Sequence, residues 1–269
     1  METTSAVREH RPTGFTAAGY QAGARFAGLD DFHLFLSTYS RDAQGRLAEA
    51  CLRRPAVCPR CARADCRRVS TRRMRCRACS QTFDLFDGRW FSKRRIPAKA
   101  WLAAIKSFEL GLGGRQTARL TGLSMPTVYA TLETIRLALC ALDSEWRAPA
   151  GDEKAPVFGV RRAGDGVKIE RIEGPIADAP AVVHQDGFVY TAPAQGYDAL
   201  IRHPSGAPRA TRRRGPRDPF LRYMIARTAK HFGIPEASFP LYLKEYEFRF
   251  NRRGRPLFEE ILDAVTRYV

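Results

Sequence analysis

Four cysteines in two closely spaced pairs are the residues of this sequence whose type and spacing most clearly predict chemistry. Cys58 and Cys61 form one Cys-x-x-Cys pair, and Cys76 and Cys79 form a second pair after residues 62–75. Each pair predicts a tight turn that aims two thiolates at one point, and the stretch between them suits a hairpin. Zinc takes four such sulfurs in a tetrahedron at about 2.3 Å. We expect a closed structural Zn²⁺ site, because the alternative, a redox dithiol, calls for a βαβ context that the sequence lacks.

The three other cysteines are not expected to bind the metal. Cys66 lies between the two pairs at a spacing that is unusual for a ligand, so we expect a free thiol. Cys51 and Cys140 lie among apolar residues and are expected to act as small core side chains. No run of about 18 apolar residues and no signal-peptide pattern is present, which predicts a cytoplasmic, nucleoid-associated protein without membrane contact. Thiols stay reduced in that compartment.

The charge balance predicts a polyanionic partner. The sequence has 45 Lys and Arg against 28 Asp and Glu, a formal net charge of +17 and a pI near 10.1. Such a charge attracts nucleic acid above all, although solubility or an Arg-rich codon usage would also produce it. Asp65 is the only acid between Cys58 and Cys79, whereas eight arginines lie there: Arg60, Arg63, Arg67, Arg68, Arg72, Arg73, Arg75 and Arg77. We expect DNA phosphate contacts from this module, chiefly by Arg67, Arg68, Arg72, Arg73 and Arg75.

Three helices are predicted after the cysteine module. The first follows Pro97 and repeats apolar residues at helical spacing, the second covers 115–120, and the third begins at Met125 with Ser124 as its cap. A glycine, Gly122, lies in the turn between the last two, as in a helix-turn-helix, although a plain three-helix bundle fits the same pattern. The third helix is expected to present Ser124, Thr127, Tyr129 and Thr131 to DNA and to turn Val128, Leu132 and Ile135 inward.

The last part of the chain mixes strand and helix patterns. Short strands are predicted at 157–160, 167–169 and 181–184, and helices at 220–232, 239–250 and 256–268. Together with a mobile N-terminal segment that ends in a helix from about Asp30 to Cys51, this gives four predicted domains. They are an N-terminal segment (1–50), a zinc ribbon (51–96), a helix-turn-helix (97–145) and a C-terminal domain (146–269).

Several of these motifs occur together in one known family. The two cysteine pairs, the sequence Arg89-Trp90-Phe91 and the stretch Tyr242–Arg253 resemble the zinc-ribbon class of bacterial insertion-sequence transposases, whose eukaryotic relatives are the Merlin elements. The resemblance covers roughly residues 50–253. It implies DNA binding, with the terminal inverted repeats of an element as a candidate target, and leaves homo-oligomers open. It also implies an RNase H-like α/β domain, in which carboxylates hold two Mg²⁺ ions for DNA cleavage and joining.

The carboxylates that such a nuclease needs are incomplete here. Asp186, after a predicted strand, matches the family's second acid. The first acid normally lies in an Asp-Glu-x-x-x-Gly-Gly motif on an opening strand, which this sequence lacks; Asp152 is the nearest substitute. Asp218 stands near the third position, where the family has Asn or Glu. We therefore expect a truncated domain, in which loss of the opening strand leaves backbone groups unpaired.

The fold class expected from these observations is multidomain α+β: a zinc ribbon, a helix-turn-helix and a truncated RNase H-like α/β domain. Glu245 and Glu247 are expected to be solvated or paired with Arg249 and Arg252 rather than catalytic. The favoured function is DNA binding with an inactive nuclease domain. The alternatives are an active transposase that uses Asp152, Asp186 and Asp218, and a zinc ribbon that binds RNA or another protein.

Overall fold

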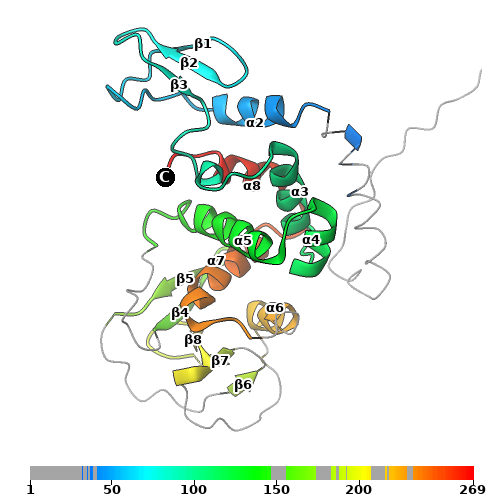
Figure 1. Cartoon of the computed structure of the whole chain (residues 1–269). Coiled ribbons are helices and arrows are strands. Elements are labelled where there is room, and N and C mark those ends of the chain that lie inside the picture. Colours follow the sequence, from blue (N-terminus) through cyan, green and yellow to red (C-terminus); the bar gives the residue numbers. More distant parts are fainter. Residues whose placement is uncertain are drawn as a thin grey trace, which may run out of the picture.

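The structure is a computed structural model. It describes residues 32, 35, 37–38, 41–146, 156–173, 183–185, 188–191, 193–206, 216, 218–228 and 233–269. These residues form a mixed α+β fold with seven α-helices and two antiparallel sheets (Figure 1). The small sheet lies at one end, the larger sheet at the other, and most helices lie between them. None of the described helices has the length and apolar character needed to cross a membrane.

The small sheet carries the cysteine module. Helix α2 (Ala43–Leu52) precedes it, and Asp42 caps this helix by accepting from the Gly45 backbone N–H at 2.8 Å. Strands β1 (Cys66–Arg68), β2 (Arg73–Cys76) and β3 (Thr82–Asp84) pair in that order, each antiparallel to the next. Along β2, Met74 points inward and is buried while its neighbours are exposed, as the alternation of a strand requires. The predicted hairpin between the cysteine pairs is confirmed.

The three helices predicted after the ribbon are present. They are α3 (Ala98–Glu109), α4 (Gly114–Thr121) and α5 (Met125–Cys140). Gly122 ends α4 at a φ of 71°, in the left-handed region that a glycine adopts without strain. The side chains predicted to face inward from α5 are all buried: Val128, Leu132 and Ile135.

The larger sheet has five strands: β4 (Val157–Ala163), β5 (Gly166–Arg171), β6 (Val183–Gln185), β7 (Phe188–Tyr190) and β8 (Ala199–Arg202). Their order is β5-β4-β8-β7-β6, and every pair is antiparallel. One face, which includes Phe158, Ile169 and Ile201, shares a core with helices α6 (Pro219–Thr228) and α7 (Phe239–Asn251). The described strands are all antiparallel, whereas an α/β arrangement also has parallel strands joined by crossover helices, so the RNase H-like domain stays a prediction.

Side chains of α7 cover part of the outer edge of β5, where we expected unpaired backbone groups. The Asn251 side chain of α7 donates to the Val167 carbonyl at 2.7 Å and accepts from the Val167 N–H at 2.8 Å. Glu247, one turn earlier, accepts from the Ile169 N–H at 2.8 Å. Two side chains of a helix thus supply the hydrogen bonds that a neighbouring strand would make, and they block this edge to further pairing.

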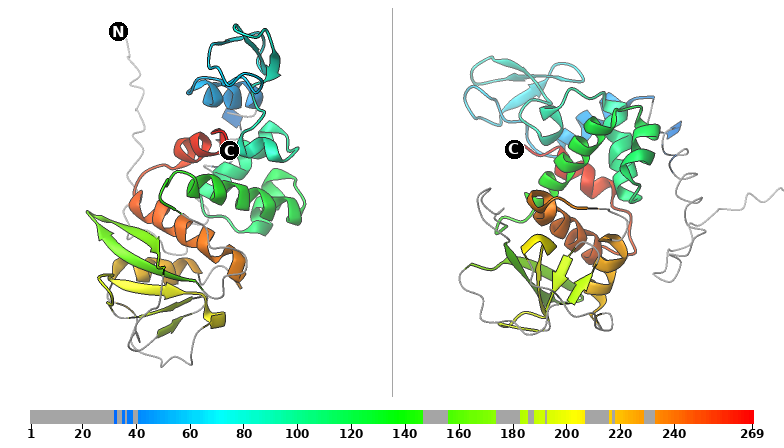
Figure 2. Two further views of the ribbon diagram at one scale, coloured as in Figure 1. Left: turned by 90° about the vertical axis from the view of Figure 1, so that its left-hand side faces the viewer. Right: turned by 60° about the horizontal axis from the view of Figure 1, so that its bottom comes forward.

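The last helix, α8 (Phe258–Val265), returns to the first half of the molecule. Its buried residues share one core with α2, the ribbon, α3 and α5, whereas the larger sheet has a core of its own. Figure 2 shows α8, in red, beside α3 and α5 and away from the sheet. The expected domain at 146–269 therefore contributes to both cores. Apolar periodicity predicts that one face of the last helix is buried, but it does not predict which part of the chain covers that face.

Candidate metal centre and basic surface

The two cysteine pairs lie on turns of the same geometry. In the first, the Cys58 N–H donates to the Arg63 carbonyl at 2.9 Å. In the second, the Cys76 N–H donates to the Gln81 carbonyl at 2.9 Å. The residue after the second cysteine of each pair has a positive φ: 56° at Ala62 and 58° at Ser80. Each turn thereby aims two sulfurs at a common point.

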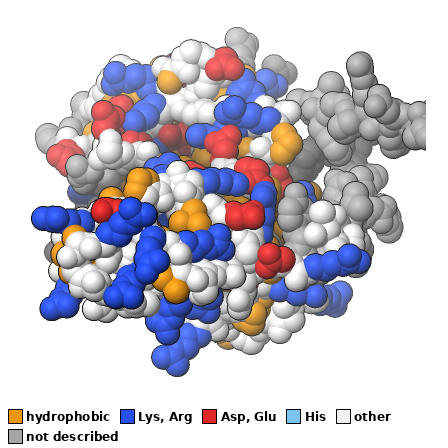
Figure 3. All heavy atoms as spheres, turned by 90° about the horizontal axis from the view of Figure 1, so that it is seen from above, with side chains coloured by type: hydrophobic (Ala, Val, Ile, Leu, Met, Phe, Trp, Pro, Cys, Tyr) orange, Lys and Arg blue, Asp and Glu red, His pale blue; other side chains and the backbone are white. Residues whose placement is uncertain are grey.

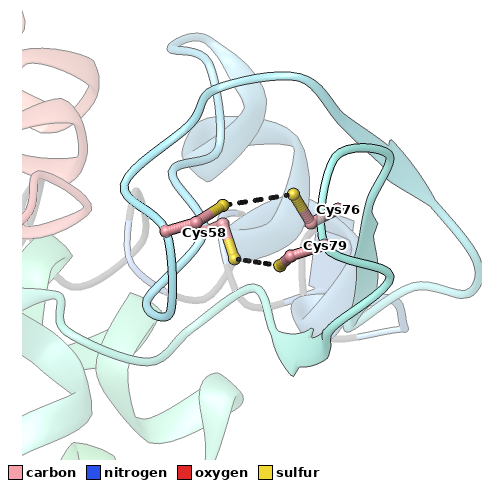
Figure 4. Close-up of side chains that lie close together, drawn as sticks. Cys58, Cys76 and Cys79 are labelled. Atoms are coloured by element: carbon pink, nitrogen blue, oxygen red, sulfur yellow. Dashed lines mark hydrogen bonds between the residues drawn. The ribbon is translucent and has the colours of Figure 1, made fainter.

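The four sulfurs converge (Figure 4). The Sγ atoms of Cys58 and Cys79 lie 3.6 Å apart, as do those of Cys61 and Cys76, and all four lie within 4.8 Å of one another. A tetrahedral zinc ion with bonds of about 2.3 Å places its sulfurs about 3.8 Å apart, whereas a disulfide would place them at about 2.05 Å. The donor set and its spacing are therefore compatible with a structural zinc site.

Backbone N–H groups favour the thiolate form of cysteines in this cluster, and the thiolate is the form that binds a cation. The N–H groups of Cys79 and Ala78 point at the Cys76 sulfur and lower the pKa of that thiol to about 6, against the opposing effect of burial. At Cys61 the Arg63 N–H favours the thiolate, but burial and the neighbouring sulfurs raise its pKa to about 12. Four adjacent thiolates repel one another, so a divalent cation is what allows all four to ionise.

The other cysteines lie where the sequence predicted. Cys66 is outside the group of four, with its sulfur 3.6 Å from the Arg63 carbonyl oxygen. Cys51 and Cys140 are buried in apolar surroundings, and this burial raises the pKa of both thiols to about 12. Neither is activated as a nucleophile.

The outer face of the ribbon gathers arginines that have no acidic partner. Arg67 and Arg75 lie directly opposite each other on β1 and β2, and Arg73 lies on the same side of β2. All three are exposed, and among the described residues none forms an ion pair with an acid. Asp84 lies opposite Arg73, but its carboxylate pairs with Arg72 at 2.5 Å. Like charges placed directly across a ladder destabilise it, so the opposed pair Arg67 and Arg75 does not stabilise the sheet.

The remaining arginines of the ribbon contribute to the same basic end. Arg68 is exposed and donates to the Ser70 carbonyl at 3.1 Å, and the ion pair of Arg77 with Asp65 spans 3.7 Å at exposed positions. Figure 3 views the molecule from this end, where basic side chains cover much of the surface and acidic ones are fewer.

Of the residues expected to contact DNA from α5, two are exposed, Ser124 and Tyr129. Ser124 is exposed, and its hydroxyl bonds the Thr127 hydroxyl at 2.8 Å rather than capping a backbone N–H. Tyr129 is 57% exposed, with its ring held against Gly114, where an added Cβ would lie 3.0 Å away. The expectation for Thr131 was wrong. This residue is fully buried and donates to the Thr127 carbonyl, because it lies on the side of α5 that faces the core.

The candidate nuclease acids do not form a described cluster. Asp152 and Asp186 lie outside the described residues. Asp218 accepts from the Leu221 N–H at 2.9 Å and from the Arg162 guanidinium at 2.7 Å, so one oxygen caps the start of α6 and the other pairs with β4. Among the residues that the structure describes, the four cysteines are the one group of three or more potential ligands that can share a metal ion.

The two glutamates of α7 were expected to be solvated or paired with Arg249 and Arg252, and both form ion pairs. Glu245 is buried between Arg136 and Arg249, each at 2.7 Å. The expected ion pair of Glu245 with Arg249 is confirmed. Its second partner, Arg136, could not be predicted from the sequence, because nothing near this basic residue indicates that it is buried. Glu247 pairs with Lys244 at 2.8 Å and not with Arg252. Arg252 instead pairs with Glu260.

Comparisons with protein-family models, with curated proteins and with solved structures found no match. The resemblance to transposases therefore stays a prediction from the sequence. The support for the candidate metal centre is geometric: the two turns are equivalent, the four sulfurs converge, and the four cysteines form no disulfide.

Proposed function

We propose that this chain is a zinc-dependent DNA-binding protein of the zinc-ribbon transposase type that does not itself cleave DNA. The observation that carries the proposal is the outer face of the ribbon, where Arg67, Arg73 and Arg75 lie together without acidic partners among the described residues. Guanidinium groups bind phosphate oxygens in a forked geometry, and a strand pair can lie along a nucleic-acid backbone. The zinc ion would hold this strand pair in shape.

The helix-turn-helix supplies the second surface of the proposal. In such motifs the first residues of the last helix reach the base edges. Here Ser124 and Tyr129 are exposed and Thr127 is half-buried, while Arg115 and Arg119 are exposed on the preceding α4. Farther along α5, the Arg136 guanidinium is buried against the Tyr242 ring at 3.8 Å, and the exposed side chain is an acid, Glu133. We therefore propose that DNA approaches α5 at its N-terminal end.

The absence of cleavage follows from the chemistry of two-metal nucleases. Their paired divalent ions lie about 3.5–4 Å apart and need several carboxylate oxygens to bind them. The described part of the chain offers no group of three or more acids that can share a metal ion, and Asp218 is engaged by Arg162 and Leu221. We propose that the sheet and α6 serve as a scaffold behind the DNA-binding surfaces.

Removing the three ribbon arginines should weaken DNA binding strongly. Replacing Arg67, Arg73 and Arg75 together by alanine removes three phosphate contacts, which should cost on the order of a hundredfold in affinity near 0.1 M salt. The measurement is fluorescence anisotropy with a labelled duplex. A control with Arg161, Arg222 and Arg255 replaced removes the same charge from exposed positions elsewhere and should bind within a few-fold of wild type. Equal loss in both variants would refute a ribbon-centred site, and tighter binding to RNA would favour an RNA partner.

The purified protein should not nick or join DNA that carries the ends of its own element, with Mg²⁺ or with Mn²⁺. The physical reason is that the sequence lacks the family's first acidic motif and Asp218 is engaged by Arg162 and Leu221, so we expect too few carboxylates to fix two ions in line with a phosphodiester. The measurement is conversion of supercoiled plasmid to nicked circles. Metal-dependent nicking that disappears in Asp186→Ala would establish the alternative, an active transposase.

A further inference from the structure

Arg89 is one of the largest fully buried side chains of the molecule, and it has no carboxylate partner among the described residues. It is 1% exposed, and its guanidinium donates to the Leu85 carbonyl at 2.8 Å, to the Thr266 carbonyl and to the Tyr268 hydroxyl at 3.2 Å. The guanidinium carbon also lies 4.3 Å from the centre of the Tyr268 ring. A buried charge is costly unless its donors are satisfied, so this arrangement depends on the segment that supplies the acceptors.

That segment, residues 266–269, forms a strap across the base of the ribbon. Tyr268 pairs with Arg89 in an antiparallel bridge. The Val269 N–H donates to the Gly88 carbonyl at 2.9 Å, and the Trp90 N–H donates to the Arg267 carbonyl at 3.3 Å. The strap therefore holds the chain where it leaves the ribbon for α3.

Tyr268 also holds the chain where it enters the ribbon. Its hydroxyl accepts from the N–H of Val57, the residue before the first cysteine of the metal centre. One side chain thus contacts both connections between the ribbon and the helices. Because α8 packs on α2, α3 and α5, the strap is anchored to the helix-turn-helix.

We propose that Arg89 and Tyr268 are positioning residues, which fix the ribbon relative to α5 so that both surfaces contact one DNA duplex at the same time. The proposal rests on the DNA binding proposed above. Two linked surfaces reinforce each other only when their geometry permits simultaneous contact, and the gain in affinity is then about 10²–10⁴-fold. Loss of the strap leaves each surface intact but makes the second contact less favourable.

The test compares two duplexes with the full chain and its Tyr268→Ala variant. A duplex of about 30 base pairs spans roughly three helical turns and reaches both surfaces, whereas one of about 10 base pairs covers a single turn. Tyr268→Ala should bind the long duplex at least about tenfold more weakly, with little change for the short one. The amides of Val57 and Trp90, which donate to the strap, should exchange faster with solvent deuterium, and the zinc content should stay unchanged.

Tyr268→Phe serves as the conservative variant. It keeps the ring beneath the Arg89 guanidinium and removes only the hydroxyl contacts, so its loss on the long duplex should be smaller than that of Tyr268→Ala. Equal losses on both duplexes in Tyr268→Ala would show general destabilisation and overturn the proposal, as would unchanged affinity for the long duplex. Failure of the wild-type protein to bind either duplex would instead remove the proposed function, and the positioning role with it.

Discussion

Replacing Cys76 by serine is expected to abolish stoichiometric zinc binding and to unfold the ribbon. Structural zinc in small modules contributes about 10–16 kcal/mol of apparent binding free energy, so loss of one ligand in four should lower the affinity on the order of a hundredfold or more. The ribbon has a small core of its own: its strands have three or four residues each, and besides the ligand Cys76 its inward side chains on β2 and β3 are Met74 and Phe83. The readouts are metal content and deuterium exchange of β1–β3.

Cys66→Ser is the matched control, because it removes a ribbon cysteine that lies outside the group of four. It should keep one equivalent of zinc and the exchange protection of wild type. Chelation of the metal from the wild-type protein should reproduce the effect of Cys76→Ser, with the helices retained. Far less than one equivalent of zinc in the wild-type protein, or full zinc content in Cys76→Ser, would contradict the metal centre.

Replacing Glu245 by glutamine is expected to lower the free energy of unfolding by about 3–5 kcal/mol, because it leaves two buried guanidiniums without their counterion. Arg136 and Arg249 flank this carboxylate with side chains 8% and 4% exposed. Arg249 also donates to the Phe108 and Glu109 carbonyls at the end of α3, so the group joins α3, α5 and α7. The measurement is urea denaturation followed by circular dichroism.

Glu259→Gln is a matched control, since Glu259 also bridges two arginines, Arg46 and Arg53, but is 49% exposed. Its loss should cost less than about 1 kcal/mol, because solvent screens exposed pairs. An effect of Glu245→Gln no larger than this would show that burial does not strengthen the network.

The same network predicts a pH dependence. Burial favours the neutral acid, but the Arg136 and Arg249 guanidiniums outweigh it and lower the pKa of Glu245 from 4.5 to about 2. A lowered pKa in the folded state means that the stabilisation is present above about pH 4.5 and is lost as the pH falls toward 2. Wild type should lose more stability than Glu245→Gln over this interval.

The parts of the molecule with strong local signals could be predicted from the sequence. Two cysteine pairs at zinc-ligand spacing led to the metal centre, and apolar periodicity with a turn glycine led to α3, α4 and α5. These features depend on residues that are near one another in the chain, where geometry follows from spacing alone.

Contacts between distant segments could not be predicted in this way. Nothing local to Arg89 shows that Tyr268 will cover it, and nothing local to β5 shows that Asn251 will pair with its edge. Thr131 was misplaced because a small β-branched polar residue fits either side of a helix, and the packing of α5 decided which. Burial of Glu245 likewise depended on Arg136, which lies far away in the sequence.

The central claim is that the ribbon binds DNA through its phosphates, and the salt dependence of binding tests it most directly. The logarithm of the association constant should fall linearly with the logarithm of salt concentration in the zinc-loaded wild-type protein. In the variant with Arg67, Arg73 and Arg75 replaced by alanine the slope should be shallower by about 2.7, because each of three lost phosphate contacts contributes about 0.9. Identical slopes in the two proteins, or wild-type affinity that does not change between about 50 and 200 mM salt, would contradict the account.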